Sequence, residues 1–416
     1  MYKKKLLIVG QDVKLNFIFE EAKRLEIDVY YIHEGQESIL PDDIDAKDVF
    51  RLPIFSNPDQ AIRDLEKLHS KYNFDGVVTL YDPALSFVAR VCEHFNFSAL
   101  DLEFTENCRQ KNNIRKILKQ NNLNSPEYFV FSDKTEIDLD LFDSLYPLIV
   151  KPSNAFFSHG VCRVNNKEEL IKAVDEVDEI NKKNISKLVY EKPLIIIEKF
   201  IDGPEFAIES FAINGEVHVL SIGYKGNCKG PFFEESVYIA PANIPENIYT
   251  DIEDQVKKSL VALGIKNGPS HTELRVDQNW KPYLIETAPR IGGSGISHYI
   301  VHESTGVNFM EMVLKHALGL IDENILNNKF EEKKVAGNYI IPVKGSGIFK
   351  EFKNIDLIKK NPQVKNFLEF YEDGLEVLPY PNFSGYPGFV LTVHNSYQEC
   401  EDFYNKLDKE IIVEYH

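Results

Sequence analysis

The chain of 416 residues is long enough for one large domain or for two to three domains of ordinary size. Its 43% hydrophobic, 12% aromatic and 27% charged residues are a globular mixture, which excludes disorder as the main character of the chain. The 47 Lys and Arg residues against 65 Asp and Glu residues leave a net charge of −18. No long basic run offsets this charge, so we expect neither nucleic acid nor an anionic membrane as a partner.

The cysteines and the apolar segments favour the cytoplasm. Five cysteines without a Cys-x-x-Cys pair fit a reducing compartment better than a disulfide framework or a zinc site. No apolar run approaches the roughly 18 residues that a membrane helix needs. The start, MYKKKLLIVGQDV, briefly resembles a signal peptide, but its apolar stretch covers only Leu6 to Val9, so we interpret it as a strand.

Strands and helices alternate over roughly the first hundred residues. Apolar runs predict strands, and helical spacing predicts helices between and after them. Such alternation predicts a parallel sheet with both faces covered, which binds ligands beyond the carboxyl ends of its strands. The predicted strands are 6–9, 29–32 and 76–80, and the predicted helices are 16–25 and 84–95.

From about Thr105 the pattern changes to longer helices and antiparallel strands. Asn214-Gly215 between two apolar runs is the strongest short hairpin signal in the chain. Several short strands with glycine-marked turns follow from about Lys333. The predicted helices are 109–120, 168–177 and 251–263, and the predicted strands are 146–150, 194–198, 206–213 and 216–222.

The stretch from Gly268 to Gly295, GPSHTELRVDQNWKPYLIETAPRIGGSG, carries the clearest chemical pattern. If Asn279-Trp280 is the turn of a hairpin, Leu274 lies opposite Ile285 and Val276 lies opposite Tyr283 on one apolar face. On the other face, Glu273 lies directly opposite Glu286.

Two carboxylates that face each other across strands are destabilising, unless something neutralises them. A divalent cation would do so, and Mg²⁺ usually takes one or two carboxylates together with substrate phosphates. The alternative is that Glu273 and Glu286 are both solvated on an outer face.

Arg290 follows Glu286 by four residues and precedes Gly292-Gly293-Ser294-Gly295. A guanidinium beside a metal site suits a phosphate or an acyl oxyanion, and glycines allow the backbone to approach a ligand. A surface ion pair and a plain loop are the alternatives for these residues taken singly. The occurrence of Glu286, Arg290 and the glycines together and in this order favours a ligand-binding site.

A second segment, IIIEKFIDGPEFAIE, has the features of a nucleotide-binding hinge. A buried strand ends in Glu198-Lys199-Phe200-Ile201 and the chain resumes at Glu205. A strand edge supplies the backbone donor and acceptor that an adenine ring needs, and Glu205 could accept hydrogen bonds from ribose hydroxyls. An ordinary strand–turn–strand is the alternative.

Two lysines fit phosphate groups of a nucleotide. Lys151 ends the strand PLIVK, and Lys111 lies in the preceding helical stretch. A lysine acts as a point charge on phosphate oxygens, although most lysines are simply solvated. The loop between Lys151 and Val161 is short enough to cover phosphates.

The order of these motifs resembles the ATP-grasp superfamily over roughly Thr105 to Leu320. Within it, GPSHTELRV followed by LIETAPRIGGSG is most similar to the carboxylate–amine ligases that join L-amino acids, the bacilysin-synthetase type of dipeptide ligase. The resemblance implies an α/β ATP-grasp fold in three parts. These are an N-terminal Rossmann-like domain (1–105), an ATP-grasp domain (106–330) with a lid at about 123–197, and a small C-terminal α+β lobe (331–416).

The resemblance also implies roles for individual residues. Glu273 and Glu286 would hold one or two Mg²⁺ ions, with Mn²⁺ as a substitute, and Arg290 would be catalytic, steadying an acyl phosphate. The loop from Ser153 to Gly160 would be a phosphate lid. The implied ATP-binding residues are Lys111, Lys151, Gly160, Glu198, Lys199, Phe200, Ile201 and Glu205, and the candidate substrate contacts are Glu235, His271, Gly292 and Gly293.

One departure from the family concerns the metal site. Many members have Asn two residues after the second metal glutamate, where this chain has Ala288, although amino-acid ligases of this type often lack it too. For Glu235 and His271 a structural role fits equally well.

The implied reaction uses ATP to convert a carboxylate into an acyl phosphate, which an amine then attacks to give an amide, ADP and phosphate. The substrates would be small carboxylic acids and amines, above all amino acids. The resemblance also implies a homodimer, since dimers are common in the family. One alternative is another ATP-grasp reaction, in nucleotide biosynthesis or as a carboxylase component, although the chain has no carrier domain.

Two further alternatives come from other classes. A nicotinamide-dependent oxidoreductase would suit the first strand, but Gly10 is followed by Gln-Asp-Val-Lys rather than by Gly-x-Gly-x-x-Gly. A non-catalytic nucleotide sensor would keep the fold without needing Glu273, Glu286 and Arg290 together.

Overall fold

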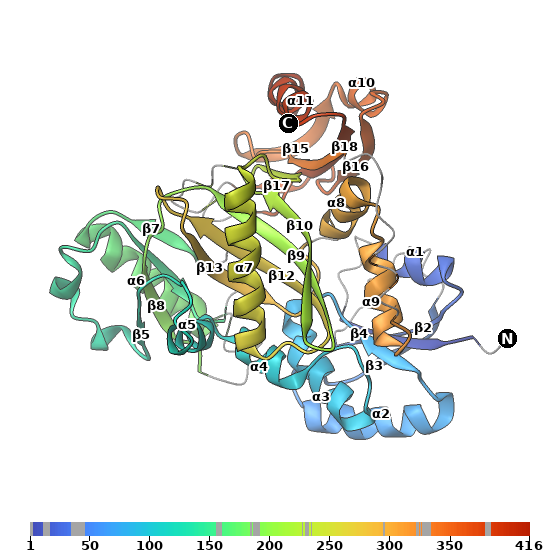
Figure 1. Ribbon diagram of the computed structural model, residues 1–416. Coiled ribbons are helices and arrows are strands. Elements are labelled where there is room, and N and C mark those ends of the chain that lie inside the picture. The colour runs from blue at the N-terminus through green and yellow to red at the C-terminus, as the bar shows by residue number, and fades with distance from the viewer. Residues whose placement is uncertain are drawn as a thin grey trace.

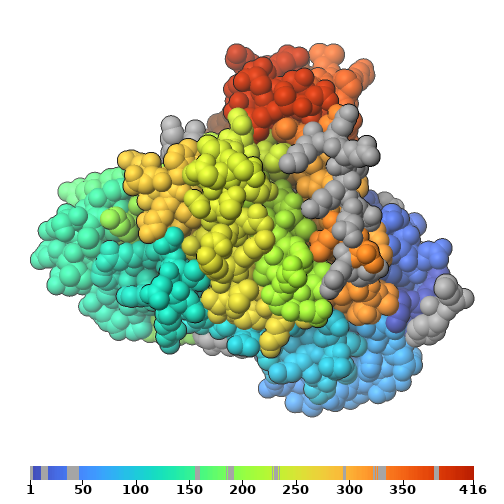
Figure 2. Space-filling model, viewed as in Figure 1, coloured from blue at the N-terminus to red at the C-terminus, as the bar shows by residue number. Residues whose placement is uncertain are grey.

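The computed structural model describes residues 3–10, 17–34, 46–154, 160–183, 185, 192–226, 228, 233, 235–293, 296–321, 324, 326, 334–378 and 384–416. Within these residues the strands form four sheets: two of four strands, one of three and one of eight. Figure 1 shows the eight-stranded sheet at the centre, with the other parts arranged around it. In the space-filling view of Figure 2, the N-terminal residues (blue), the segment near residue 150 (green) and the C-terminal residues (red) project in different directions.

The N-terminal part is a parallel sheet of order β3-β2-β1-β4, the order of a Rossmann half, which confirms the predicted strand–helix alternation. The prediction missed β3 and α2, because β3 (AKDVFR) has no fully buried residue and hence no apolar run. The elements are β1 (Lys5–Val9), α1 (Phe17–Arg24), β2 (Asp28–His33), β3 (Ala46–Arg51), α2 (Pro58–Tyr72), β4 (Gly76–Val78), the 3₁₀ turn η1 (Asp82–Ala84) and α3 (Leu85–Phe95).

The next part is an antiparallel sheet of order β5-β8-β6-β7, against which α6 packs. The helix predicted at 109–120 is α5, which begins two residues later at Lys111 because Gln110 is extended, and Arg109 ends the preceding helix α4. The elements are α4 (Leu102–Arg109), α5 (Lys111–Gln120), β5 (Tyr128–Phe131), η2 (Lys134–Glu136), η3 (Leu139–Phe142), β6 (Leu148–Pro152), β7 (Cys162–Val164), α6 (Lys167–Lys183) and β8 (Ile195–Lys199).

The eight-stranded sheet has the order β13-β12-β9-β10-β11-β14-β18-β16. Its last three strands come from the segment after residue 331, so the C-terminal part continues the central sheet. The elements are β9 (Glu205–Ile213), β10 (Glu216–Tyr224), β11 (Val237–Ala240), α7 (Glu246–Leu263), β12 (Gly268–Val276), β13 (Pro282–Ala288), α8 (Ile296–Thr305), α9 (Phe309–Ala317), β14 (Val335–Ile340), β16 (Val364–Glu369) and β18 (Gly388–His394).

A smaller sheet of order β17-β15-β19 and two helices complete the C-terminal part around a separate apolar core. The elements are β15 (Gly347–Lys353), α10 (Ile355–Lys359), β17 (Glu376–Val377), α11 (Tyr397–Glu410) and β19 (Ile412–Tyr415). None of the helices in the described ranges has the length and apolarity needed to cross a bilayer.

The two faces of the central sheet differ in chemistry. One face packs apolar side chains such as Phe206, Ile208 and Leu274 against α7, which lies across the sheet in Figure 1. Because successive side chains of a strand point to opposite faces, Glu205 and Glu209 on β9 lie on the other face. That polar face forms one wall of a cavity.

Both predicted hairpins are present. Asn214 and Gly215 have φ of 52° and 83°, as a two-residue primed turn requires. In the β12–β13 hairpin, Glu273 pairs with Glu286 as predicted. The prediction was wrong beyond this pair: Leu274 faces Leu284 and Val276 faces Pro282, instead of Ile285 and Tyr283.

The shift comes from an irregularity next to the two glutamates and from a longer turn. The ladder skips Ile285 on β13, the residue just before Glu286, as in a β-bulge. The loop holds three residues between Asp277 and Lys281, with Trp280 at a φ of 62°, rather than the two residues assumed.

Candidate active site

A cavity of about 210 Å³ lies between the β5–β8 sheet and the polar face of the central sheet. It collects most of the residues that the sequence singled out, although they come from segments as far apart as Lys111 and Gly293. The predicted residues in its lining are Lys111, Lys151, Glu198, Lys199, Phe200, Ile201, Glu205, Glu235, His271, Glu273, Glu286, Arg290 and Gly293.

Two predicted residues lie outside this lining. Gly160 has a φ of +76°, and a Cβ there would meet Ile180 and Pro152 at 3.0 to 3.2 Å. Gly292 packs closely against Ser297, Glu209 and His271. Most of the predicted lid loop, residues 155–159, and Ser294-Gly295 lie outside the described residues.

The opposed carboxylates are each held by an ammonium group. Lys225 Nζ lies 2.7 Å from Glu273 Oε1, and Lys111 Nζ lies 2.9 Å from Glu286 Oε1. Burial opposes the ionisation of Glu273, but Lys225 and His271 hold the pKa of its carboxyl group well below the ordinary value. The like-charge pair is therefore tolerated in this structure because cations neutralise it.

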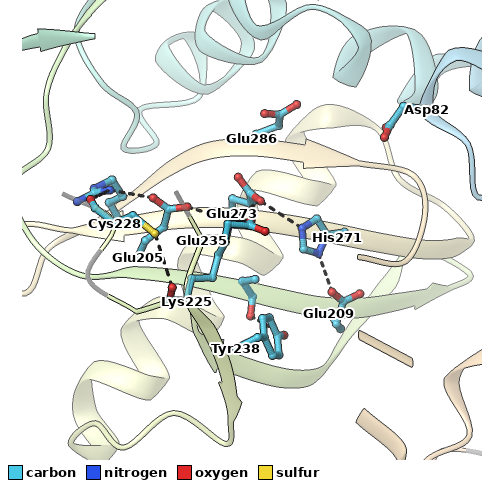
Figure 3. Close-up of polar contacts among 12 residues, drawn as sticks. Asp82, Glu205, Glu209, Lys225, Cys228, Glu235, Tyr238, His271, Glu273 and Glu286 are labelled. Atoms are coloured by element: carbon cyan, nitrogen blue, oxygen red, sulfur yellow. Dashed lines mark hydrogen bonds and ion pairs between the residues drawn. The ribbon is translucent and has the colours of Figure 1, made fainter. Parts of the chain in front are cut away.

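Lys225 binds three carboxylates, and Figure 3 shows it among the glutamates Glu205, Glu235 and Glu273. Its Nζ lies 3.0 Å from both Glu205 Oε1 and Glu235 Oε1, in addition to Glu273. Although burial lowers the pKa of this ammonium group, the three carboxylates raise it well above the ordinary value. Tyr386 donates a hydrogen bond of 2.9 Å to Glu235 Oε2, so the C-terminal part reaches the site.

A second buried cluster centres on Glu198. Lys151 Nζ lies 2.7 Å from its Oε2, and Arg115 Nε donates to its Oε1 at 2.8 Å. Arg115 also donates to the carbonyl oxygens of Leu284 and Ile285. Burial opposes ionisation of Glu198, but Arg115 and Lys151 keep the pKa of the carboxyl group below its ordinary value. The cluster thus joins α5, β6, β8 and β13 behind the cavity.

The hinge after β8 is held by Arg275. Its Nε and Nη2 donate to the carbonyls of Ile201 and Gly203 at 2.9 and 2.6 Å, and its Nη1 lies 2.8 Å from Glu205 Oε2. The Phe200 ring carries the guanidinium carbons of Arg163 and Arg275 at 4.4 and 5.0 Å. This arrangement fixes one aromatic wall of the cavity.

Arg290 is fixed from the N-terminal part. Its Nη2 lies 2.6 Å from Asp82 Oδ2, at the start of η1 after β4, and its Nη1 donates to the carbonyl of Ile291. Its Nε is buried and has no hydrogen-bond partner within the described residues. The Nε donor of this guanidinium thus remains for a ligand.

His271 lies between two carboxylates, as Figure 3 shows. Its Nδ1 lies 2.6 Å from Glu209 Oε1, and its Nε2 lies 3.5 Å from Glu273 Oε1. Burial alone would lower the pKa of His271, but Glu209 and Glu273 raise it to about 9. Glu209 also accepts a hydrogen bond from the Gly292 amide at 3.2 Å, so it connects β12 with the glycine loop.

Comparison with known proteins places this geometry in a family. The chain matches an ATP-grasp domain over residues 144–298 and an ATP-grasp N-terminal domain over residues 19–97. Its structure matches that of an L-amino acid ligase from Bacillus licheniformis over 100% of both chains, with a TM-score of 0.92 and 45% sequence identity. The chain belongs to the L-amino acid ligases of the ATP-grasp family.

More distant relatives agree. Alanine–anticapsin ligase from Bacillus subtilis is 25% identical over 56% of this chain and 52% of its own length, so the chain matches about half of that relative. Phosphoribosylglycinamide synthetase from Anaerococcus prevotii covers 100% of both chains with a TM-score of 0.72 and 23% identity. That likeness shows a shared fold only.

The predicted fold and ligase class are thus confirmed. The similarity to L-amino acid ligases supports ATP-dependent formation of an amide bond as the activity of this chain. The ATP-grasp family uses ATP. The oxidoreductase, the sensor and the other ATP-grasp reactions are less supported.

The sequence did not single out several residues that shape this ligase's cavity. Lys225 follows a predicted strand, and Asp82 follows another, so their position at strand ends was a signal that could have been used. Of the others, Arg275, Asn338 and Tyr386 line the cavity and Arg115 and Glu209 hold residues that line it, all of them through long-range packing. The missed residues are Asp82, Arg115, Glu209, Lys225, Arg275, Asn338 and Tyr386.

Proposed function

We propose that this ligase joins two amino acids in the cavity. The carboxylate of one attacks the γ-phosphorus of ATP, which releases ADP and forms an acyl phosphate. The amine of the second attacks the acyl carbon, which forms the amide bond and releases phosphate. The observation that carries this proposal is the opposed pair Glu273 and Glu286 on the cavity wall, with Arg290 beside it.

The donor set fits Mg²⁺ that shares its coordination with a nucleotide. Among the described side chains, no group of three or more His, Cys, Asp or Glu residues could hold a metal alone. Two carboxylates suffice when phosphate oxygens and water complete the shell of Mg²⁺. Glu273 and Glu286 would hold one or two such ions, which neutralise the charge of the phosphoryl group being transferred.

The nucleotide would lie between the two sheets. The amides of Lys199 and Phe200 already donate to Glu127 and Pro147, so the amide of Ile201 is the hinge donor that we assign to adenine. Lys111 and Lys151 would bind phosphate oxygens. Glu205 keeps lone pairs for the ribose, although Lys225 and Arg275 each bind one of its oxygens.

The acyl phosphate would lie against Arg290, whose Nε lacks a partner within the described residues. A guanidinium aimed at developing phosphate charge stabilises it most in a site that excludes water. Exclusion of water also protects the acyl phosphate from hydrolysis. Glu235, His271 and the amides at Gly292 and Gly293 would bind the amino acids.

The test incubates the protein with ATP, Mg²⁺ and pools of amino acids, and measures phosphate release and amide products by mass spectrometry. Glu286→Gln should abolish turnover and keep the unfolding transition of the wild type, since it removes one negative ligand. Glu216→Gln, on an exposed side chain of β10, is the matched control.

Wild-type turnover by Glu286→Gln would contradict the metal assignment. Adenine-nucleotide binding without turnover across broad panels of acids and amines would favour a sensor instead.

A further inference from the structure

A buried carboxamide on the cavity wall has no partner. Asn338, on β14, is 0% exposed and lines the cavity. Within the described part of the chain, neither its Oδ1 nor its Nδ2 makes a hydrogen bond. Buried polar side chains are nearly always hydrogen-bonded, and leaving both a donor and an acceptor unpaired is costly. Such a group indicates a missing ligand.

The neighbouring residues do not satisfy this carboxamide. Asn338 pairs with Tyr238 on β11 and with Leu391 on β18. The Tyr238 hydroxyl already donates to the carbonyl of Ala207 at 3.2 Å. The Tyr238 ring is fixed over Gly223, where a Cβ atom would come within 2.4 Å of it.

Two apolar side chains line the cavity beside Asn338. Ile340 on the same strand and Phe389 on β18 line the cavity with it. The ion pairs of the site come from β9, β12, β13 and the segments that follow β10 and precede β11, where Lys225 binds Glu205, Glu235 and Glu273. The carboxamide of Asn338 itself carries no charge to compensate an α-ammonium or α-carboxylate group, so a neutral group fits it better.

We propose that Asn338 is a specificity-determining residue that binds the side chain of one amino-acid substrate. Its Oδ1 accepts from, and its Nδ2 donates to, a neutral group that offers both a donor and an acceptor, a carboxamide or a hydroxyl. Ile340 and Phe389 pack against the carbon atoms of the same side chain. This assignment rests on the proposed function and names the substrate class of that site.

The test compares substrates that differ in polarity but not in shape: glutamine against methionine and threonine against valine. For the full-length protein with ATP and Mg²⁺, kcat/KM is measured for each. In Asn338→Leu, the ratio of kcat/KM for glutamine over methionine should fall by about tenfold or more, because an unpaired polar group is penalised in an apolar pocket. The threonine over valine ratio should fall in the same direction.

Asn338→Ala is the second variant, which removes the carboxamide without adding bulk, should the leucine disturb the sheet. Thr392→Val is the matched control, since Thr392 lies on β18 with its hydroxyl bonded to Tyr404, away from the cavity. The control should keep both ratios of the wild type.

Unchanged ratios in active Asn338 variants would overturn the assignment, and so would an equal loss for polar and apolar substrates. A wild type that turns over no amino acid would overturn the proposed function and this assignment together. The two failures are therefore distinguishable.

Discussion

Gly292 shows how tightly the site constrains one backbone position. A Cβ atom there would lie 1.9 Å from Ser297 Oγ, 2.5 Å from Glu209 Oε1 and 2.7 Å from His271 Nδ1. At Gly293, the next residue, nothing lies within 4 Å of such an atom. The glycine at 292 is thus required by the close approach of the loop to the Glu209–His271 pair.

Gly292→Ala should therefore destabilise the protein by about 1–3 kcal/mol, the usual cost of overpacking, while Gly293→Ala should change stability little. Urea unfolding followed by circular dichroism measures both free energies. Equal unfolding free energies for the two variants would contradict the packing described here.

At the scale of single residues, sequence spacing predicted that Glu273, Glu286 and Arg290 lie close together, because they belong to one hairpin and the segment that follows it. Asn338 and Tyr386 could not be predicted in this way. Their place in the cavity depends on strands that join the sheet from a distant segment.

Among the secondary-structure elements, α5 is tied to β8 and β13 through one buried guanidinium. Arg115 is 0% exposed and binds Glu198 together with two carbonyls of β13. Removing one partner of a buried ion pair leaves an uncompensated charge, which costs more than the pair itself contributes.

Arg115→Met should lower the free energy of unfolding by about 3–5 kcal/mol, since Glu198 would keep only Lys151. Arg63→Met, on the exposed side of α2, is the control and should stay within about 0.5 kcal/mol of the wild type. Chemical denaturation of both variants provides the comparison. A stability of Arg115→Met equal to that of the control would refute the importance of this cluster.

The β12–β13 hairpin shows what pattern alone predicts of an element and what it leaves open. Alternation predicted the apolar face of β12, since Leu274 and Val276 are both 0% exposed. Alternation could not predict the irregularity after Glu273. The extra residue lies on β13, so it leaves the apolar pattern of β12 unchanged and alters only which β13 residues pair with β12.

Across the whole molecule, the N-terminal part contributes directly to the cavity. Asp82 follows β4 at the carboxyl edge of the parallel sheet and binds Arg290, 208 residues away. From the sequence we predicted that ligands bind at this edge of the parallel sheet. In the structure, Asp82 at this edge positions Arg290, which belongs to the neighbouring part of the molecule.

Asp82→Asn should lower kcat by about tenfold or more, because Arg290 loses the charged partner that orients it, a change worth about 1.5–3 kcal/mol. Asp59→Asn, which breaks the surface pair with Arg90 in the same part of the molecule, should leave kcat unchanged. Steady-state kinetics with saturating ATP and amino acids measures both variants. Equal kcat values would show that Arg290 needs no support from Asp82.

The continuous eight-stranded sheet has a consequence for biosynthesis. The strand bearing Asn338 is translated long after β9–β13, so the growing polypeptide holds β11 with a bare edge until β14 arrives. Unpaired edges invite pairing with other molecules. Nascent chains stalled before β14 should therefore associate through β11, and the same late strand that completes substrate recognition also removes this hazard.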